Sequence, residues 1–195
     1  MPKRERTIIE TAVHLAEVGG FDAVRLRDVA AEAGIGLGTV YSFFKSKEDI
    51  LLAAVGQEAE RFEAVLDAAV VPGATPLARV TWFFTLTTRA LLARPNFARA
   101  VLRALGGGDQ KSAERVYQFH HGVTRMIVAC LRGVRAGEVE DAPAEGEARV
   151  GFLLQQIWFA ALVGWNIGMR DEDGIVDDMR ASAELLLAGL EATRQ

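Results

Sequence analysis

Residues 20–51 read GFDAVRLRDVAAEAGIGLGTVYSFFKSKEDIL, and this stretch decides the fold of the first part of the chain. Apolar residues at helical spacing predict a helix of two turns over 26–33, which ends at Gly34. A second short helix is predicted over 37–44, and a longer helix begins at Ser46. The stretch therefore predicts three helices separated by short turns.

Two small side chains, Ala30 and Ala33, allow the two short helices to cross closely. Such a pair is a helix-turn-helix, whose second helix is narrow enough to enter the major groove of DNA. The stretch resembles the DNA-binding motif of the TetR family of one-component transcriptional repressors. The matching residues are 20–23, 26–30, 33–35, 38–41, Phe44 and 46–48.

The resemblance implies a function and its partners. Members of this family are dimers that bind a palindromic DNA operator and leave it when a small molecule binds their second domain. We therefore expect a transcriptional regulator that represses its target, with double-stranded DNA, a hydrophobic small-molecule effector and a second copy of this chain as partners. No cofactor is implied.

The spacing of the recognition helix predicts which side chains face DNA. Val40 and Phe44 lie four residues apart and face the core, so Thr39 and Tyr41 point away from it. Positive charges near the motif add phosphate contacts, and Lys3, Arg4 and Arg6 are expected to form a leading arm that reaches the minor groove. The predicted DNA-binding residues are Lys3, Arg4, Arg27, Gly36, Leu37, Gly38, Thr39, Tyr41, Lys45 and Lys47.

Two positions depart from the family pattern, which usually has a hydroxyl-bearing residue at each. Arg25 stands before the first helix of the motif and Gly36 stands just after its turn. Losing a capping hydroxyl costs about 1 kcal/mol at each helix, which Asp28 offsets in part through the helix dipole. The recognition helix offers few bidentate donors, so we expect phosphate contacts and DNA shape to dominate affinity.

Composition and charge restrict the classes of protein that remain possible. The formal charge of −4 gives no overall attraction to nucleic acid, so binding depends on a local patch. One cysteine, Cys130, excludes an internal disulfide and a cysteine-rich metal site. The first twenty residues lack the pattern of a secretory signal, so a reducing cytoplasm is the expected compartment.

Residues 150–169 contain no charged residue and are about as long as a membrane-spanning helix. Gln155, Gln156, Asn166 and three glycines argue against a span, as does the lack of a second one. We predict a buried helix and no membrane partner.

The rest of the chain reads as helices, without a long alternation of apolar and polar residues that would indicate a strand. The predicted fold class is all-α, with about nine helices. Glycines at 19–20 end the first helix, residues 71–74 end a long one, and Thr75 begins the next with a proline at its first position.

We predict two domains on this basis. Residues 1–50 form the three-helix DNA-binding domain with its helix-turn-helix, and residues 51–195 form a helical ligand-binding and dimerisation domain.

Aromatic residues concentrate in the second domain. By default they form its core, and a subset is expected to line an apolar effector site with a few polar groups from His120, His121, Gln155 or Asn166. The predicted lining residues are Trp82, Phe83, Leu86, Phe97, Tyr117, His120, His121, Met126, Trp158, Leu162 and Trp165. Residues 71–77 and 157–165 also look similar to repressors of steroid and lipid breakdown in the family, which indicates an acyl or steroid-like effector.

The last two helices resemble the dimerisation pair of the family, and small residues along them permit close helix packing. The predicted interface residues are Gln155, Phe159, Val163, Ala183, Leu187 and Leu190.

Two other classes are less well supported by the sequence. The second alternative is an enzyme, but no set of Ser, His and an acid and no pair of carboxylates stands out as a catalytic grouping. The third alternative is a membrane or partner-binding helical protein. His120 and His121 are adjacent and point about 100° apart on a helix, so they do not form a metal site together. We interpret His120 as a hydrogen-bonded core residue and predict no metal.

Overall fold

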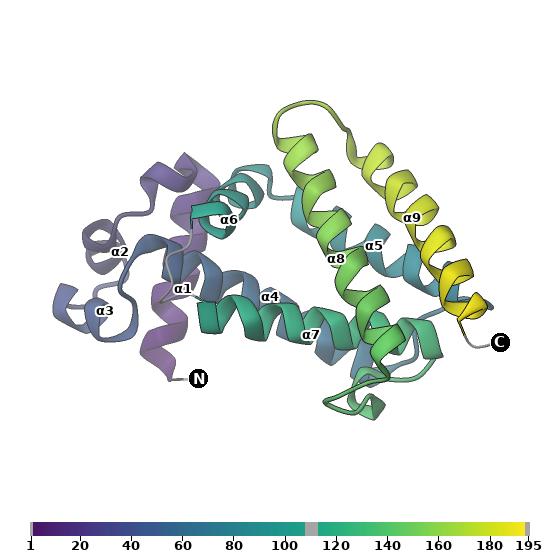
Figure 1. The fold of residues 1–195 in the computed structure, drawn as a ribbon. Helices are drawn as coiled ribbons and strands as arrows, with labels where there is room; N and C mark the ends of the chain where they lie inside the picture. The colour runs from purple at the N-terminus through teal and green to yellow at the C-terminus, as the bar shows by residue number, and fades with distance from the viewer. Residues whose placement is uncertain (1, 108–112, 194–195) are drawn as a thin grey trace. The chain divides into compact units, whose positions relative to one another are not determined.

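The computed structural model describes residues 2–107 and 113–193, and over these it is helical, with no strand. All-α is therefore confirmed, with nine α-helices in the described part of the chain (Figure 1). The elements are α1 (Lys3–Gly19), η1 (Phe21–Ala23), α2 (Leu26–Glu32), α3 (Leu37–Phe43), α4 (Lys47–Ala68), α5 (Pro76–Leu92), α6 (Pro95–Gly107), α7 (Ala113–Arg132), η3 (Ala136–Glu138), α8 (Glu145–Asn166) and α9 (Glu172–Ala192).

The chain forms two compact units. Unit 1 comprises residues 1–58 and 91–119, and unit 2 comprises 59–90 and 120–195. Helices α4 and α7 each supply residues to both units. This partition by compactness differs from the functional boundary that the sequence places after residue 50, and that boundary stays a prediction.

Unit 1 has one apolar core. Helix α1 buries Ile8, Ile9, Ala12 and Ala16, which recur at three- and four-residue steps and so lie on one face. The first turns of α4 add Ile50 and Leu51, and α6 adds a row of small and aromatic side chains. Helices α1, α4 and α6 thus cover the apolar face of the helix-turn-helix.

Local signals end and begin the helices as predicted. Gly20 and Gly34 have φ of 69° and 64°, the left-handed conformation that glycine adopts without a steric penalty. The Ser46 hydroxyl accepts from the Asp49 amide at 3.2 Å, and the Asp49 carboxylate accepts from the Lys45 amide at 3.0 Å. This is a capping box whose return bond is shifted by one residue, and it forms at the predicted helix start.

Unit 2 is built from α5, α8, α9 and the later parts of α4 and α7. Helices α8 and α9 lie side by side and run in opposite directions (Figure 1). Glycine allows α8 to approach its neighbours, because a Cβ at Gly151 would lie 3.1 Å from the Thr124 side chain and one at Gly146 would lie 2.8 Å from Leu190.

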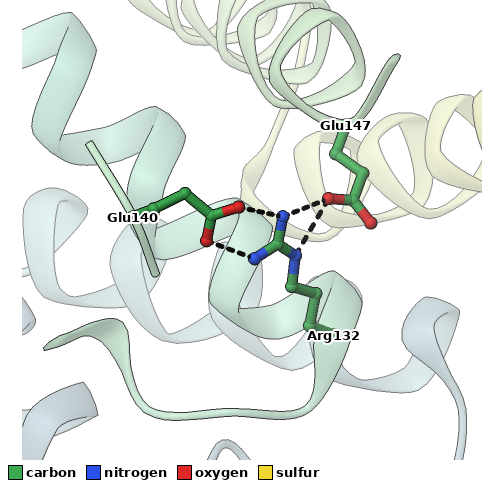
Figure 2. A network of polar contacts seen from close by, with 3 residues as sticks. All are labelled: Arg132, Glu140 and Glu147. Atoms are coloured by element: carbon green, nitrogen blue, oxygen red, sulfur yellow. Dashed lines mark hydrogen bonds and ion pairs between the residues drawn. The ribbon is translucent and has the colours of Figure 1, made fainter. Parts of the chain in front are cut away.

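The connection between α7 and α8 is held by charge pairs. Figure 2 shows the Arg132 guanidinium between two carboxylates, donating to Glu140 at 2.6 and 3.0 Å and to Glu147 at 2.7 and 2.9 Å. Glu147 is buried, so its charge depends on this partner. Arg79 of α5 donates to the carbonyls of Cys130 and Leu131, at the end of α7.

The uncharged segment becomes most of α8, which buries Val150, Leu154 and Leu162. Within the described ranges, no helix combines the length and the apolar character needed to cross a membrane.

Candidate DNA-binding surface and effector-domain residues

Helix α3 has two chemically distinct faces. Val40 is fully buried, as is Phe44 at the end of the helix. Leu37 and Tyr41 are 41% and 49% exposed, and Thr39 is half-buried. The predicted orientation of the helix is therefore confirmed, and a small exposed surface of mixed polarity covers its outer side.

Glycines leave the backbone of this outer side accessible. A Cβ at Gly38 would meet no atom within 4 Å, so nothing within the chain demands glycine there. Gly36 precedes α3 with φ −60° and has no side-chain cap, and Arg25 likewise does not cap α2. The two departures from the family pattern thus leave both helix starts without a capping side chain, and Asp28 lies in the first turn of α2.

Lys47 lies at the start of α4 beside η1. Its Nζ is 3.4 Å from the Phe21 carbonyl oxygen, 3.5 Å from a carboxylate oxygen of Asp22 and 3.9 Å from the centre of the Phe21 ring. Arg103 of α6 donates to the other Asp22 oxygen at 3.0 Å and lies 4.4 Å from the same ring. Two cations therefore share one carboxylate and one aromatic ring.

The charge balance at this cluster follows from those contacts. The hydrogen bond from Arg103 is the main cause that lowers the pKa of Asp22 below its usual range, with Lys47 adding to it. Asp22 therefore stays ionised at neutral pH. The exposed Asp22 carboxylate pairs with both Lys47 and Arg103, and all three residues belong to unit 1.

The other predicted basic residues lie on the surface of unit 1. Arg27 pairs with Asp28 at 3.3 Å, and Lys45 donates to the Tyr41 carbonyl oxygen at 3.0 Å. These contacts keep Lys45 at the end of α3, next to the exposed Tyr41 side chain.

The expected N-terminal arm is instead helical. Helix α1 begins at Lys3, and the Arg6 amide donates to the Pro2 carbonyl oxygen at 3.2 Å. Lys3, Arg4 and Arg6 are exposed on the first turn of that helix, because the backbone hydrogen bonds start immediately after a proline that favours the helix start. The structure therefore does not show Lys3, Arg4 and Arg6 as an extended arm.

Most predicted lining residues fall in unit 2, and two do not. Phe83, Met126 and Leu162 are buried there, whereas Trp82, Leu86, Trp158 and Trp165 are half-buried. Phe97 and Tyr117 belong to unit 1.

Phe97 is fully buried in the core of unit 1, and Tyr117 is 62% exposed. The sequence assigns both to the second domain, and the structure assigns both to the compact unit that contains the helix-turn-helix.

The two histidines have different surroundings. The imidazole Nδ1 of His120 lies 2.6 Å from Gln155 Oε1, and Phe152 packs edge-on to the same ring. His121 Nε2 lies 3.1 Å from the Asp141 carbonyl oxygen. The predicted hydrogen bond of His120 is confirmed, but the residue is half-buried and not fully within the core.

The residues predicted for dimerisation separate by burial. Gln155 and Ala183 are buried inside unit 2 and present nothing to a partner, because their faces of α8 and α9 point into the unit. Val163 is exposed, and Phe159, Leu187 and Leu190 are half-buried. The exposed apolar residues on these helices also include Phe152, Leu153 and Leu185.

Neither a metal site nor a reactive thiol is apparent in the described chain. Over residues 2–107 and 113–193, no three His, Cys, Asp or Glu side chains are placed to hold a metal ion. Cys130 is buried and unpaired, and burial raises the pKa of its thiol to about 12.

Sequence reasoning missed the contacts that join distant helices. Asp22 and Arg103 are far apart in the chain, as are Asp49 and Arg115, whose closest atoms are 2.7 Å apart. Only an acidic residue next to an aromatic one, at 21–22, hinted at a cation site. The basic partner on α6 has no recognisable local signal.

Comparison with known proteins agrees with this arrangement. The family model "Bacterial regulatory proteins, tetR family" matches residues 8–54, and "Tetracyclin repressor-like, C-terminal domain" matches residues 73–186. The HTH-type transcriptional repressor KstR of Mycobacterium tuberculosis is 30% identical over 163 residues, which are 84% of this chain and 71% of that protein.

Two solved structures share the fold. A TetR transcriptional regulator from Rhodococcus sp. RHA1 superposes with a TM-score of 0.83 at 23% identity, covering 94% of this chain and 95% of that one. The transcriptional regulator FadR from Bacillus subtilis, in complex with stearoyl-CoA, gives a TM-score of 0.67 at 19% identity, covering 94% and 98%. Together the two family matches, the similarity to KstR and the helix-turn-helix of unit 1 show that the chain belongs to the TetR family of transcriptional regulators.

Proposed function

We propose that this chain is a homodimeric repressor that binds a palindromic operator with α3 and the start of α4, and leaves it when a long-chain acyl compound binds unit 2. The observation that carries the DNA-binding part is the outer side of α3, where Leu37, Gly38 and Tyr41 are accessible while Val40 is buried. A short helix with that exposure fits a major groove about 12 Å wide.

The proposed contacts divide by chemistry. Thr39 and Tyr41 carry hydroxyls suited to phosphate oxygens, and Leu37 offers an apolar contact to a thymine methyl group. Lys45 and Lys47 supply positive charge next to α3, and Arg27 supplies it on α2. Because most of these are phosphate contacts, affinity should fall steeply with salt.

Dimerisation through α8 and α9 follows from exposed apolar side chains. Phe152, Leu153 and Val163 on α8 and Leu185 on α9 lie on the surface of unit 2. Burying them against a second copy gives a two-fold interface in which the same patch faces itself. The dimer then presents two α3 helices to half-sites about 34–36 Å apart, or a multiple of that.

The proposed effector class is supported by unit 2 and by a relative. The buried apolar side chains of α5, α7 and α8 suit an aliphatic chain, and the FadR structure of similar fold contains stearoyl-CoA. The KstR of Mycobacterium tuberculosis is named as a repressor, which supports repression here. The effector must bind the free protein more tightly than the operator-bound protein, or release does not follow.

The test is fluorescence anisotropy on a labelled duplex taken from the DNA that flanks the gene, with a shuffled duplex of equal length as the control. Specific binding exceeds binding to the shuffled duplex by about a thousandfold or more. Stearoyl-CoA then releases the protein from the specific duplex, and free coenzyme A, which has no acyl chain, does not. Equal affinity for both duplexes contradicts the proposal.

A further inference from the structure

The interior of unit 2 contains an amide group without a hydrogen-bond acceptor. Gln155 on α8 is 2% exposed, and its Oε1 lies 2.6 Å from the His120 ring nitrogen. Its Nε2 is buried and has no partner in the described chain. Since buried donors are nearly always paired, an unpaired amide of this kind calls for an acceptor other than the residues that the structure describes.

The contacts of α8 enclose this amide. Gly151, Gln155 and Trp158 follow each other at helical spacing on one side of α8. Gly151 packs against Thr124 of α7, and Trp158 Nε1 donates to the Thr88 hydroxyl of α5 at 2.9 Å. Gln155 therefore lies between a residue that touches α7 and one that touches α5.

Helix α5 carries a second buried polar atom of the same kind. The Thr85 and Thr87 hydroxyls bond to carbonyl oxygens of their own helix, and Thr88 accepts from Trp158. The hydroxyl of Thr81, one turn before Thr85, is buried and has no partner in the described chain. Arg125 Nε on α7 is also buried without a partner, although its other two nitrogens pair with Glu63 and Asp141. The described part of unit 2 thus holds three unpaired polar atoms, two of them on uncharged side chains, and a few orienting groups among apolar side chains are typical of a binding site.

We infer that Gln155 is the polar anchor of the effector, with its Nε2 donating to the carbonyl oxygen of the bound acyl group. The inference rests on the proposed function and adds to it the atom that recognises the ligand. His120 acts as a positioning residue, because its ring nitrogen bonds to Oε1 and thereby fixes the plane of the amide.

The chemistry favours a neutral carbonyl. A carbonyl oxygen only accepts, so it pairs with the amide and leaves no donor of its own unpaired. An ionised carboxylate would lose its hydration in this apolar interior, and the Arg125 guanidinium of α7 already pairs with the carboxylates of Glu63 and Asp141. A site built around a buried donor also discriminates against a ligand that lacks the acceptor.

The experiment uses two probes that differ by one group. Stearoyl-CoA carries a thioester carbonyl, and S-octadecyl-CoA has a methylene in its place. Affinities of both are measured by calorimetry on the full chain, for wild type, Gln155→Met and Gln156→Met. Gln156 is the adjacent α8 residue and is only half-buried, so its variant is the matched control.

We expect wild type and Gln156→Met to prefer the thioester by about 5- to 10-fold, the value of one net hydrogen bond. Gln155→Met loses this preference while binding the thioether at least as well as wild type. The ratio is measured within each variant, so a partly unfolded preparation does not change it. His120→Phe should reduce the preference and leave thioether affinity unchanged.

Equal affinity of wild type for both probes, or a preference retained in Gln155→Met, overturns the inference while leaving an acyl-responsive repressor intact. Such a result would mean that the amide binds a water molecule. If wild type binds neither probe, the proposed acyl effector fails and the inference fails with it. Calorimetry tells these cases apart, and operator binding, measured separately, tests the DNA-binding part of the proposed function.

Discussion

Lys47 and Asp22 form an ion pair across unit 1, with 3.5 Å between the ammonium nitrogen and the carboxylate oxygen. Arg103 binds the other oxygen of the same carboxylate, at 3.0 Å. A phosphate that binds Lys47 must therefore compete with Asp22. The pair links the proposed DNA contact of α4 to α6, which carries Arg103.

Asp22→Asn should raise operator affinity by roughly two- to fivefold, because it frees Lys47 and removes a negative charge near the proposed phosphate contact. Lys47→Met should lower affinity and reduce the slope of log K against log salt by about 1. Anisotropy over a salt series measures both. Glu32→Gln, an exposed acidic change on α2, is the control, and a salt slope unchanged in Lys47→Met would contradict the contact.

Tyr41→Ala should weaken operator binding without unfolding the domain, since its side chain is 49% exposed. Val40→Ala, one residue earlier, should cost about 2 kcal/mol of unfolding free energy, because the valine is fully buried. Thermal melts and anisotropy on the same preparations separate the two effects. Loss of stability in the tyrosine variant would show that its ring belongs to the core.

Glu140→Gln should destabilise the chain near neutral pH and have no effect in strong acid. The hydrogen bond from Arg132 lowers the pKa of Glu140 to about 2, so folding is favoured above its ordinary pKa and this contribution disappears as pH falls toward 2. Melting temperatures between pH 7 and pH 2.5 follow the difference. Glu10→Gln, in an exposed pair with Arg6, is the comparison, and a difference as large at pH 2.5 as at pH 7 would exclude the mechanism.

Cys130 should not react with Ellman's reagent in the native protein at pH 8, because it is buried and its pKa is raised to about 12. Denaturant should expose one equivalent of thiol. Ser42→Cys, on an exposed position, supplies the reactive control. Rapid native reaction at Cys130 would indicate that α7 opens readily.

Leu185→Glu should convert the proposed dimer to monomers, since the side chain is 76% exposed on α9 and a charge there opposes apolar burial. Val18→Glu places the same charge on an exposed apolar position of unit 1, and should leave the dimer unchanged. Light scattering with multiple angles gives the mass of each. A dimer that survives Leu185→Glu would move the interface to another surface.

Local sequence signals were sufficient to predict the helices and the side of the recognition helix that faces the core. Capping at Ser46, the glycine ends at Gly20 and Gly34, and the buried position of Val40 all depend on residues within one or two turns of each other. Such signals act through hydrogen bonds and side-chain spacing inside a single helix, and the sequence displays both directly.

Tertiary packing decided the rest. The sequence predicted that Phe97 lines the effector site and that Gln155 lies in the interface, and the structure buries the first in unit 1 and pairs the second with His120. Periodicity tells which side of a helix is apolar, but α8 has no charged residue from Val150 to Asn166, so its sequence does not single out one apolar side. The neighbour that covers each side is chosen by long-range packing, in which residues far apart in the chain, such as Asp22 and Arg103, come into contact.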